Sequence, residues 1–325
     1  MKVVDSHVHL YSRSHLAELA WMTPGHALAR DCRLAEYVAD ARGLPPGRDL
    51  AGIVFVEADR VQSAADWSGP ENEFAFAGRC LRGQLAPDEG PNAHADLVVG
   101  VVPWAPLPQG PAAMEAFVAA LKERDAVAFE SVKGFRYLVQ DKPPGVMTAP
   151  AFVESLRWMG ERGLAFDVGI DLHRAGPGQF VEAVAMVSAA PDTTYVFNHL
   201  GKPVLTALPA PGDGRFAAWR AALAELAGFR TYVKLSGVFA ELPPGAADET
   251  ALALVYPWVA AVFELFGPER VLWASDWPVC TVEGGADSVG RWARLTDALL
   301  RRLGVDAAGQ AMVWHGAAAR AYRLV

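Results

Sequence analysis

The chain has 325 residues, of which 52% are hydrophobic and 20% charged, and its formal net charge is -8. This length suits one α/β barrel domain with a large core, and the acidic balance argues against nucleic acid or an anionic membrane as a partner, because both require a basic face. The first ten residues lack the apolar stretch of a secretory signal, and we see no apolar run of the roughly 18 to 20 residues that span a bilayer. We therefore expect a cytoplasmic protein.

Eight short apolar runs, rich in β-branched residues, recur along the chain and predict strands. Their near-continuous apolar character is typical of parallel strands that are covered on both faces, and eight is the number that closes a parallel barrel. We therefore predict a (β/α)8 barrel, an α/β fold, as a single domain over residues 1–325. The runs lie at residues 2–4, 51–56, 97–102, 127–135, 164–170, 194–198, 231–235 and 270–275.

Helices are predicted between these runs. Residues 148–163 place Thr148 as an N-cap, Pro150 in the first turn and Gly163 at the end of one helix. Residues 253–267 behave likewise and end at Gly267. The connection from about residue 13 to 50 is long and has a helical stretch of its own, so we predict that it caps the site.

Polar side chains follow the predicted strands, at the end where parallel barrels place their active sites. His7 and His9 come directly after the first run. The later runs are followed by Glu57, Trp104, Lys133 with Arg136, Asp171 with His173, Asn198 with His199, Lys234 with Ser236, and Asp276 with Trp277. We expect these side chains to form one polar ring at the mouth of the barrel.

The spacing of His7 and His9 has a physical meaning on a strand. Residues i and i+2 project to the same side, so both imidazoles can share one metal ion or one substrate oxygen. A pair of hydrogen-bonded packing histidines is the alternative, and it would be the better interpretation of an isolated H-x-H motif. The presence of His199 and Asp276 at later strand ends favours the functional interpretation.

Two carboxylates have the best positions for chemistry. Asp276 is the candidate general base, because a carboxylate beside a metal or an imidazole cluster can orient and deprotonate water; the alternative is a helix N-cap in "SDWP". Glu57 could ligate a cation, bind a substrate hydroxyl or form a salt bridge with Arg60.

Three cationic side chains are candidates for binding substrate. Lys133, Arg136 and Lys234 could hold a carboxylate, a lactone oxygen or a sugar hydroxyl, and arginine is the most geometrically specific of them. Ion pairs with acidic residues inside the barrel mouth are the alternative for each one.

Five motifs in chain order resemble a known family. "DSHVHL", "KGFRY", "NHLGKP", "VKLSG" and "VLWASDWPV" are similar to the lactonase branch of the amidohydrolase superfamily, which includes L-fuconolactonases, L-rhamnonolactonases and 2-pyrone-4,6-dicarboxylate lactonases. The resemblance runs from residue 3 to about residue 280. It implies a distorted (β/α)8 barrel that hydrolyses a lactone.

The resemblance also implies roles for the site residues. His7, His9 and His199 match histidines that polarise the lactone carbonyl, and Asp276 matches the aspartate that activates water. Members of the branch use one divalent metal ion or none. We expect zinc, with His7, His9, Glu57 and Asp276 as its ligands, and keep a metal-free site as the alternative. Asn198 is a departure, because the family more often has Asp before this histidine.

The expected substrate is a small sugar-derived aldonolactone. A dicarboxylate lactone would need several arginines, whereas here only Arg136 is well placed. Trp104 and Trp277 suit the face of a sugar ring. His173, Lys133 and Lys234 complete the predicted substrate-binding set.

Four alternatives stay open from the sequence. They are a dicarboxylate lactonase, a nonoxidative decarboxylase of the same superfamily, a two-metal amidohydrolase with a carboxylated Lys133, and a barrel that binds a sugar acid without catalysis. Self-association of the chain also stays open.

Overall fold

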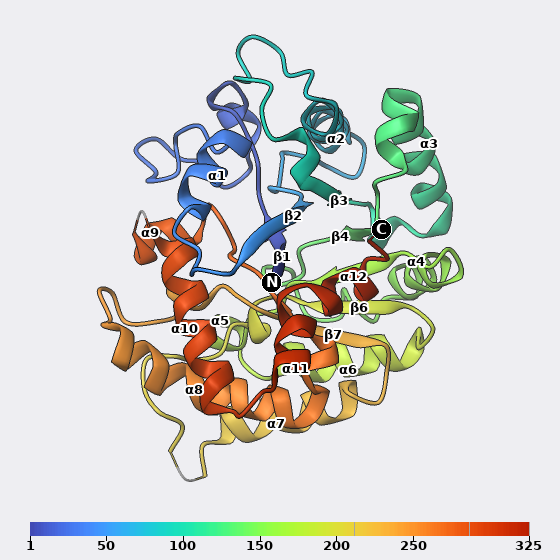
Figure 1. The fold of residues 1–325 in the computed structure, drawn as a ribbon. Helices are drawn as coiled ribbons and strands as arrows, with labels where there is room; N and C mark the ends of the chain where they lie inside the picture. Colours follow the sequence, from blue (N-terminus) through green and yellow to red (C-terminus); the bar gives the residue numbers. More distant parts are fainter. Residues whose placement is uncertain (211, 286, 325) are drawn as a thin grey trace.

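The computed structural model describes residues 1–210, 212–285 and 287–324. Eight parallel strands lie within these ranges, in two sheets with the orders β1-β2-β3 and β4-β5-β6-β7-β8. Figure 1 shows the strands at the centre of the molecule with helices around them. The strands are β1 (Lys2–Val8), β2 (Asp49–Val56), β3 (Val98–Val102), β4 (Gly134–Arg136), β5 (Ala165–Val168), β6 (Thr194–Phe197), β7 (Thr231–Leu235) and β8 (Val271–Trp273).

Isolated bridges join the two sheets at both seams. Val101 pairs with Val132, and Trp104 with Arg136, between the β3 and β4 regions. On the other side, Val8 at the end of β1 pairs with Trp277 after β8. The strands therefore follow one another around a ring with irregular joins, which confirms the predicted α/β fold of distorted barrel type.

Twelve α-helices within the described residues surround or extend the strands. Several of the helices that follow β2 to β8 cover the outer faces of the sheets (Figure 1). They are α1 (Leu34–Ala41), α2 (Ser68–Arg82), α3 (Pro111–Phe129), α4 (Pro150–Glu161), α5 (Leu172–Ala175), α6 (Gly178–Ala189), α7 (Gly214–Leu226), α8 (Asp248–Phe266), α9 (Cys280–Gly284), α10 (Ser288–Arg302), α11 (Ala307–Ala311) and α12 (Ala317–Ala321).

Two local predictions are wrong. The fourth strand begins at Gly134, whereas residues 127–129 still belong to α3, where Val127 is 66% exposed; helix continuity outweighs the strand preference of a short apolar run. Thr148 is not the N-cap of α4. Its hydroxyl donates to the Gly145 carbonyl oxygen, and Ala149 takes the cap position without a side-chain bond.

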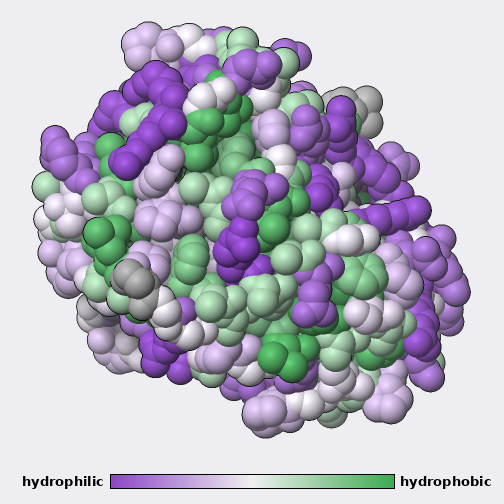
Figure 2. All heavy atoms as spheres, turned by 90° about the horizontal axis from the view of Figure 1, so that it is seen from below, coloured by the Kyte–Doolittle hydropathy of each residue, from purple (hydrophilic) through white to green (hydrophobic). Residues whose placement is uncertain are grey.

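Helix α8 is long and apolar enough to cross a membrane by length and composition alone, contrary to the expectation that the sequence holds no apolar run of that length. In the fold, Leu254, Trp258 and Val262 on one face of α8 are buried, and the helix contacts α7, α10, β7 and β8. That environment is typical of a core helix. Hydrophilic and hydrophobic residues are intermixed on the surface drawn in Figure 2.

A cluster of small apolar side chains packs between the strands and α12. Aromatic Tyr322, at the end of α12, contacts this cluster and donates to Asp167 of β5. Because this part of the interior is filled, the polar side chains of the ring have room only toward the carboxyl ends of the strands. The strand members of the cluster are Val4, Val54, Val56, Val102, Ala165, Val196 and Leu272.

Candidate active site

A cavity of about 530 Å³ lies at the carboxyl ends of the strands, where a parallel barrel is expected to hold its active site. His9, Arg136, His199 and Asp276 all line it. These four residues follow or end β1, β4, β6 and β8, so the predicted meeting of distant strand ends is confirmed.

The segment from residue 13 to 50 contributes one wall of this cavity. Trp21, His26, Ala27 and Leu28 line it, and the Trp21 indole donates to the Ala58 carbonyl oxygen at 2.8 Å. That bond ties the segment to the end of β2. Whether the segment opens and closes as a cap stays a prediction.

Three imidazoles converge on one carboxylate oxygen. The Nε2 atoms of His7, His9 and His199 lie 3.7, 3.7 and 3.6 Å from Oδ1 of Asp276. The His7 and His9 Nε2 atoms are 3.1 Å apart, as expected for residues i and i+2 of one strand. His7, however, is fully buried and lies behind His9, outside the cavity lining. The structure therefore does not support direct contact between His7 and a substrate carbonyl.

The backbone around the cavity is strained. Asp59, His199, Lys202 and Asp276 line it with φ of 56°, 55°, 51° and 64°, a region that residues other than glycine rarely adopt. Gly237 is required beside them, because a Cβ at this position would lie 2.6 Å from Cγ of His199. Such strain persists where the fold over-determines it, commonly at functional sites.

The second ring nitrogen of each histidine has a different partner. Nδ1 of His9 lies 3.0 Å from the Val56 carbonyl oxygen, and Nδ1 of His199 lies 2.9 Å from the Ser236 hydroxyl. Nδ1 of His7 instead lies 2.9 Å from Nζ of Lys234. A carbonyl can only accept a hydrogen bond and an ammonium can only donate one. His9 therefore carries its proton on Nδ1, whereas His7 lies between two cations, because Nη1 of Arg136 is 3.4 Å from its Nε2.

Burial sets the charges in this cluster. It lowers the pKa of His7 well below its ordinary value, an effect increased by the charge of Lys234. It also lowers the pKa of His199 to about 3. Burial opposes ionisation of Asp276, but His199 and His9 outweigh it and lower the pKa of that carboxyl. At neutral pH the site therefore combines neutral His7 and His199 with one ionised carboxylate.

The donor atoms of His7, His9 and Asp276 lie close enough together to hold one metal ion. In a tetrahedral zinc site with bonds of 2.0 to 2.1 Å, neighbouring ligand atoms are about 3.3 Å apart, which is within the observed range of 3.1 to 3.7 Å. His9 also has the tautomer of a ligand. His7 has a cation at each ring nitrogen instead, because Nζ of Lys234 lies 2.9 Å from its Nδ1 and Nη1 of Arg136 lies 3.4 Å from its Nε2. The set therefore fits zinc by distance, whereas the two cations beside His7 oppose the binding of a further positive charge.

Glu57 is not part of that group among the described residues, and its role as a metal ligand stays a prediction that the contacts of its carboxylate do not favour. Nε of Arg136 donates to one Glu57 oxygen at 2.5 Å, and the backbone N–H of Asp59 donates to the other at 2.5 Å. Both carboxylate oxygens therefore have donors. The predicted partner Arg60 pairs with Glu18 instead.

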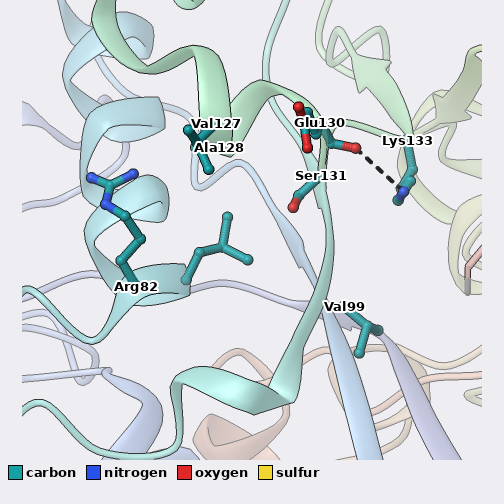
Figure 3. A pocket seen from close by; sticks show the side chains of 8 residues that line it. Arg82, Val99, Val127, Ala128, Glu130, Ser131 and Lys133 are labelled. Carbon is teal, nitrogen blue, oxygen red and sulfur yellow. Dashed lines mark hydrogen bonds between the residues drawn. The ribbon is translucent and has the colours of Figure 1, made fainter.

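Lys133 is misplaced in the sequence prediction. It precedes β4 and lines a different cavity near the amino ends of β3 and β4, together with Arg82 and Val99 (Figure 3). The cause is the late start of β4, which leaves Lys133 at the beginning of the strand rather than at its end. This position also removes it as a carboxylated metal ligand at the site.

The two predicted tryptophans are core residues. Trp104 is 4% exposed and packs edge-on against Phe117. Trp277 is fully buried and donates to Asp40 at 2.6 Å. Trp21, which the sequence analysis did not single out because it lies in a connection, is the tryptophan that lines the cavity.

His173 and Lys234 do not line the cavity but contact residues of the site. His173 lies at the rim, with Nδ1 2.6 Å from the Glu241 carboxylate, and Glu241 itself lines the cavity. Lys234 is fully buried beneath His7. Asn198 is 2% exposed and lies outside the cavity lining.

Three further polar residues that line the cavity were missed: Asp59, Gln140 and Lys202. Nζ of Lys202 donates to Oε1 of Gln140 at 2.6 Å. The sequence held a signal for two of them, since Asp59 follows Glu57 by two residues and Lys202 ends the segment "NHLGK". Gln140 lies four residues after the end of β4 and had no comparable signal.

Comparison with known proteins agrees with this geometry. The sequence model of the amidohydrolase family matches residues 4–324. L-rhamnono-gamma-lactonase of Scheffersomyces stipitis is 36% identical over 99% of both chains. L-fucono-1,5-lactonase of Burkholderia multivorans is 28% identical over 99% of this chain and 96% of its own.

Solved structures give the same result. A crystal structure of an amidohydrolase from Burkholderia multivorans with bound zinc is 27% identical, with a TM-score of 0.73 and complete coverage of both chains. A second crystal form of that amidohydrolase, with bound HEPES, has a TM-score of 0.76 and 25% identity over the whole of both chains. The fold, the histidine and aspartate cluster and these matches together show that this chain belongs to the amidohydrolase family.

Proposed function

We propose that the protein hydrolyses a sugar-derived lactone, an aldonolactone such as L-rhamnono- or L-fuconolactone, to the aldonic acid. The observation that carries this proposal is the Asp276 carboxylate, which faces the cavity among three imidazole nitrogens at 3.6 to 3.7 Å. Full-length similarity to two sugar lactonases supports the substrate class.

Asp276 acts as the general base. Its lowered pKa keeps the carboxylate ionised near neutral pH, so it can accept a proton from a water molecule in the cavity. The water oxygen forms a bond to the lactone carbonyl carbon. When the tetrahedral intermediate collapses, the bond to the ring oxygen breaks, and Asp276 returns its proton to that oxygen.

Arg136 and His199 stabilise the developing oxyanion. The Arg136 guanidinium lines the cavity. His199 presents Nε2 to the same space when its Nδ1 accepts from Ser236, 2.9 Å away. Removal of one such donor commonly costs about 2.7 to 4 kcal/mol of transition-state stabilisation. His9 completes this face of the site through its contact with Asp276.

The outer wall of the cavity suits a neutral, hydroxylated substrate. Asp59, Gln140, Lys202 and Glu241 offer both donors and acceptors for hydroxyl groups, and Trp21 adds an apolar face. Arg136 is the single arginine among the described lining residues, and the buried Glu57 carboxylate offsets its charge. Lys202, the lysine among these residues, lies 3.7 Å from the Asp171 carboxylate. Because both cations already have acidic neighbours, two substrate carboxylates would be poorly neutralised here, which favours a sugar lactone over a dicarboxylate.

The predicted zinc ion stays a prediction. A zinc-bound relative and the close packing of His7, His9 and Asp276 favour it. The positive charges of Lys234 and Arg136 beside the two ring nitrogens of His7 oppose it. Each step above uses only side chains of this chain.

A panel of L- and D-aldonolactones, followed with a pH indicator, tests the proposal. We expect at least one L-aldonolactone to open well above its spontaneous rate, and Asp276→Asn to abolish the difference. No hydrolysis of any lactone would contradict the proposal. Faster turnover of 2-pyrone-4,6-dicarboxylate, or release of carbon dioxide from an aromatic acid, would favour the corresponding alternative.

A further inference from the structure

Asp59 differs from the charged side chains that surround it in the cavity wall. The Arg136 guanidinium, for example, already donates to Glu57. Asp59 makes its hydrogen bonds through the backbone, as a donor to Glu57 and as an acceptor from Ala20. Its carboxylate accepts no hydrogen bond from the residues that the structure describes, although Asp59 lines the cavity. A carboxylate in that situation is an acceptor that a bound molecule can use.

The backbone of Asp59 is fixed from both sides. Its N–H donates to the Glu57 carboxylate at 2.5 Å, and its carbonyl oxygen accepts from the Ala20 N–H at 2.9 Å. The φ of Asp59 is 56°, a left-handed conformation that aspartate adopts more readily than most residues other than glycine. Because this backbone is already ordered, little freedom is lost when the side chain binds a partner.

Trp21 of the segment from residue 13 to 50 is the neighbour of Asp59 in this wall. The Trp21 indole donates to the Ala58 carbonyl oxygen at 2.8 Å, and the preceding residue, Ala20, donates to Asp59. An apolar aromatic face and a carboxylate therefore adjoin each other at the cavity. This combination suits a sugar ring, which offers C–H groups to the aromatic face and hydroxyl donors to the carboxylate.

Glu57 places Asp59 close to the proposed position of the reacting carbonyl. One oxygen of the Glu57 carboxylate accepts from Nε of Arg136, and the other accepts from the N–H of Asp59, both at 2.5 Å. Arg136 and Asp59 are therefore held on the two sides of one carboxylate. When the carbonyl oxygen of a lactone faces Arg136, a hydroxyl that reaches Asp59 has to lie near that carbonyl, and the adjacent carbon carries the nearest one.

We propose that Asp59 is a specificity-determining residue that binds the hydroxyl on the carbon next to the lactone carbonyl, and so selects lactones that carry this hydroxyl. The inference rests on the proposed function and narrows its substrate class. A lactone without this hydroxyl covers the carboxylate and leaves it without a donor, which is costly for a buried acceptor. Sites built to bind a substrate hydroxyl reject the analogue that lacks it for this reason.

The first experiment compares two substrates. It measures kcat/KM for the preferred aldonolactone and for its 2-deoxy counterpart, which lacks only the hydroxyl in question. The unaltered protein is expected to favour the hydroxylated lactone at least about tenfold. Asp59→Gly removes the carboxylate, and glycine adopts the observed φ without strain. We expect this variant to lose activity on the hydroxylated lactone alone, so that the two substrates become nearly equivalent.

Two further variants make the comparison specific. Asp59→Asn keeps the shape of the side chain and one acceptor oxygen but not the charge, and it is expected to keep part of the preference. Asp49→Asn is the matched control, because Asp49 lies at the amino end of the same strand, β2, with its side chain 81% exposed. It is expected to keep the full preference. An equal loss on both lactones in Asp59→Gly, or an unchanged preference, would overturn the proposal.

A second experiment measures binding and does not depend on hydrolysis. Aldonolactams keep the carbonyl and the hydroxyls of the lactones, whereas their amide bond resists hydrolysis. By calorimetry, the unaltered protein is expected to bind the hydroxylated lactam at least about tenfold more tightly than its 2-deoxy counterpart, and Asp59→Gly is expected to bind both alike. Equal affinities in the unaltered protein, or no binding of either lactam, would contradict the role of Asp59. If no lactone is hydrolysed, the proposed function fails, but the two lactams still decide this role.

Discussion

Two cavities at opposite ends of the strands differ in every respect that matters for chemistry. The cavity at the carboxyl ends brings together His9, His199 and Asp276. The cavity at the amino ends, lined by Arg82, Lys133 and exposed Val127, is of similar size, about 460 Å³. Volume therefore does not identify the functional end of this barrel.

Buried charge does distinguish the two ends. Glu57, Arg136 and Asp276 are each at most 5% exposed and face the carboxyl end. Such groups are costly to bury, and they persist where a reaction uses them. At the amino end, Arg82 pairs with Asp125 and is half-exposed, as ordinary surface ion pairs are.

The largest expected effect tests the carboxyl-end cavity directly. Asp276→Asn removes the general base while keeping the shape of the side chain, and we expect kcat on the preferred lactone to fall by about 10²- to 10⁴-fold. Circular dichroism and thermal unfolding check that the fold is retained. A variant with more than half of the original activity would exclude Asp276 as the base.

Next comes a contrast between two tryptophans. Trp277→Ala is expected to lower the free energy of unfolding by about 3–5 kcal/mol, because Trp277 is fully buried. Trp21→Ala is expected to raise KM about tenfold at nearly constant kcat. Trp21 lines the cavity, and a side chain that contacts the substrate equally in the ground state and the transition state affects KM alone. Denaturant unfolding and steady-state kinetics separate the two. Equal loss of stability in both variants would contradict the contrast.

A smaller effect concerns pH. Burial raises the pKa of Glu73 to about 8, and this carboxyl accepts from the backbone N–H of Ala58, beside Asp59 of the cavity. The pKa of Glu73 is higher in the folded state than in the unfolded state. Its contribution to the free energy of unfolding is therefore greatest below about pH 4.5 and is lost as the pH rises through about 8. Glu73→Gln is therefore expected to gain in Tm relative to the unaltered protein between pH 5 and pH 9, by about 2–4 °C for each kcal/mol. A constant difference in Tm across that range would refute this assignment.

The smallest effect belongs to the amino-end cavity. Within the part of the chain that the structure describes, Lys133 donates only to the Glu130 carbonyl oxygen, at 3.4 Å. Lys133→Met is expected to change kcat/KM less than about twofold and stability by at most about 0.5 kcal/mol, as for most surface substitutions. A tenfold loss of activity would show that the two ends of the barrel are coupled.

Much of the architecture could be predicted from pattern. Each of the eight apolar runs overlaps one strand, although the fourth begins inside α3, and the short spacing of His7 and His9, together with the later His199 and Asp276, placed the centre of the site. Periodicity and the carboxyl-end rule of parallel barrels are local or topological, so one sequence suffices to apply them.

The errors have a common physical origin. A difference of a few residues in the start of β4 moves Lys133 from one end of the barrel to the other. Trp277 follows its strand as expected but turns toward Asp40 rather than the cavity. Side-chain direction after a strand depends on packing partners that are distant in sequence.

By itself, then, the sequence determined the parallel α/β fold, the strand order and the identity of the histidine and aspartate cluster, because these depend on residue type and spacing. Only the tertiary structure decided which ring nitrogen of His7 faces Lys234, that the Glu57 carboxylate accepts a hydrogen bond from Arg136, and that Trp21 lines the cavity. Each of these depends on contacts between elements far apart in the chain, which a pattern along the sequence does not record.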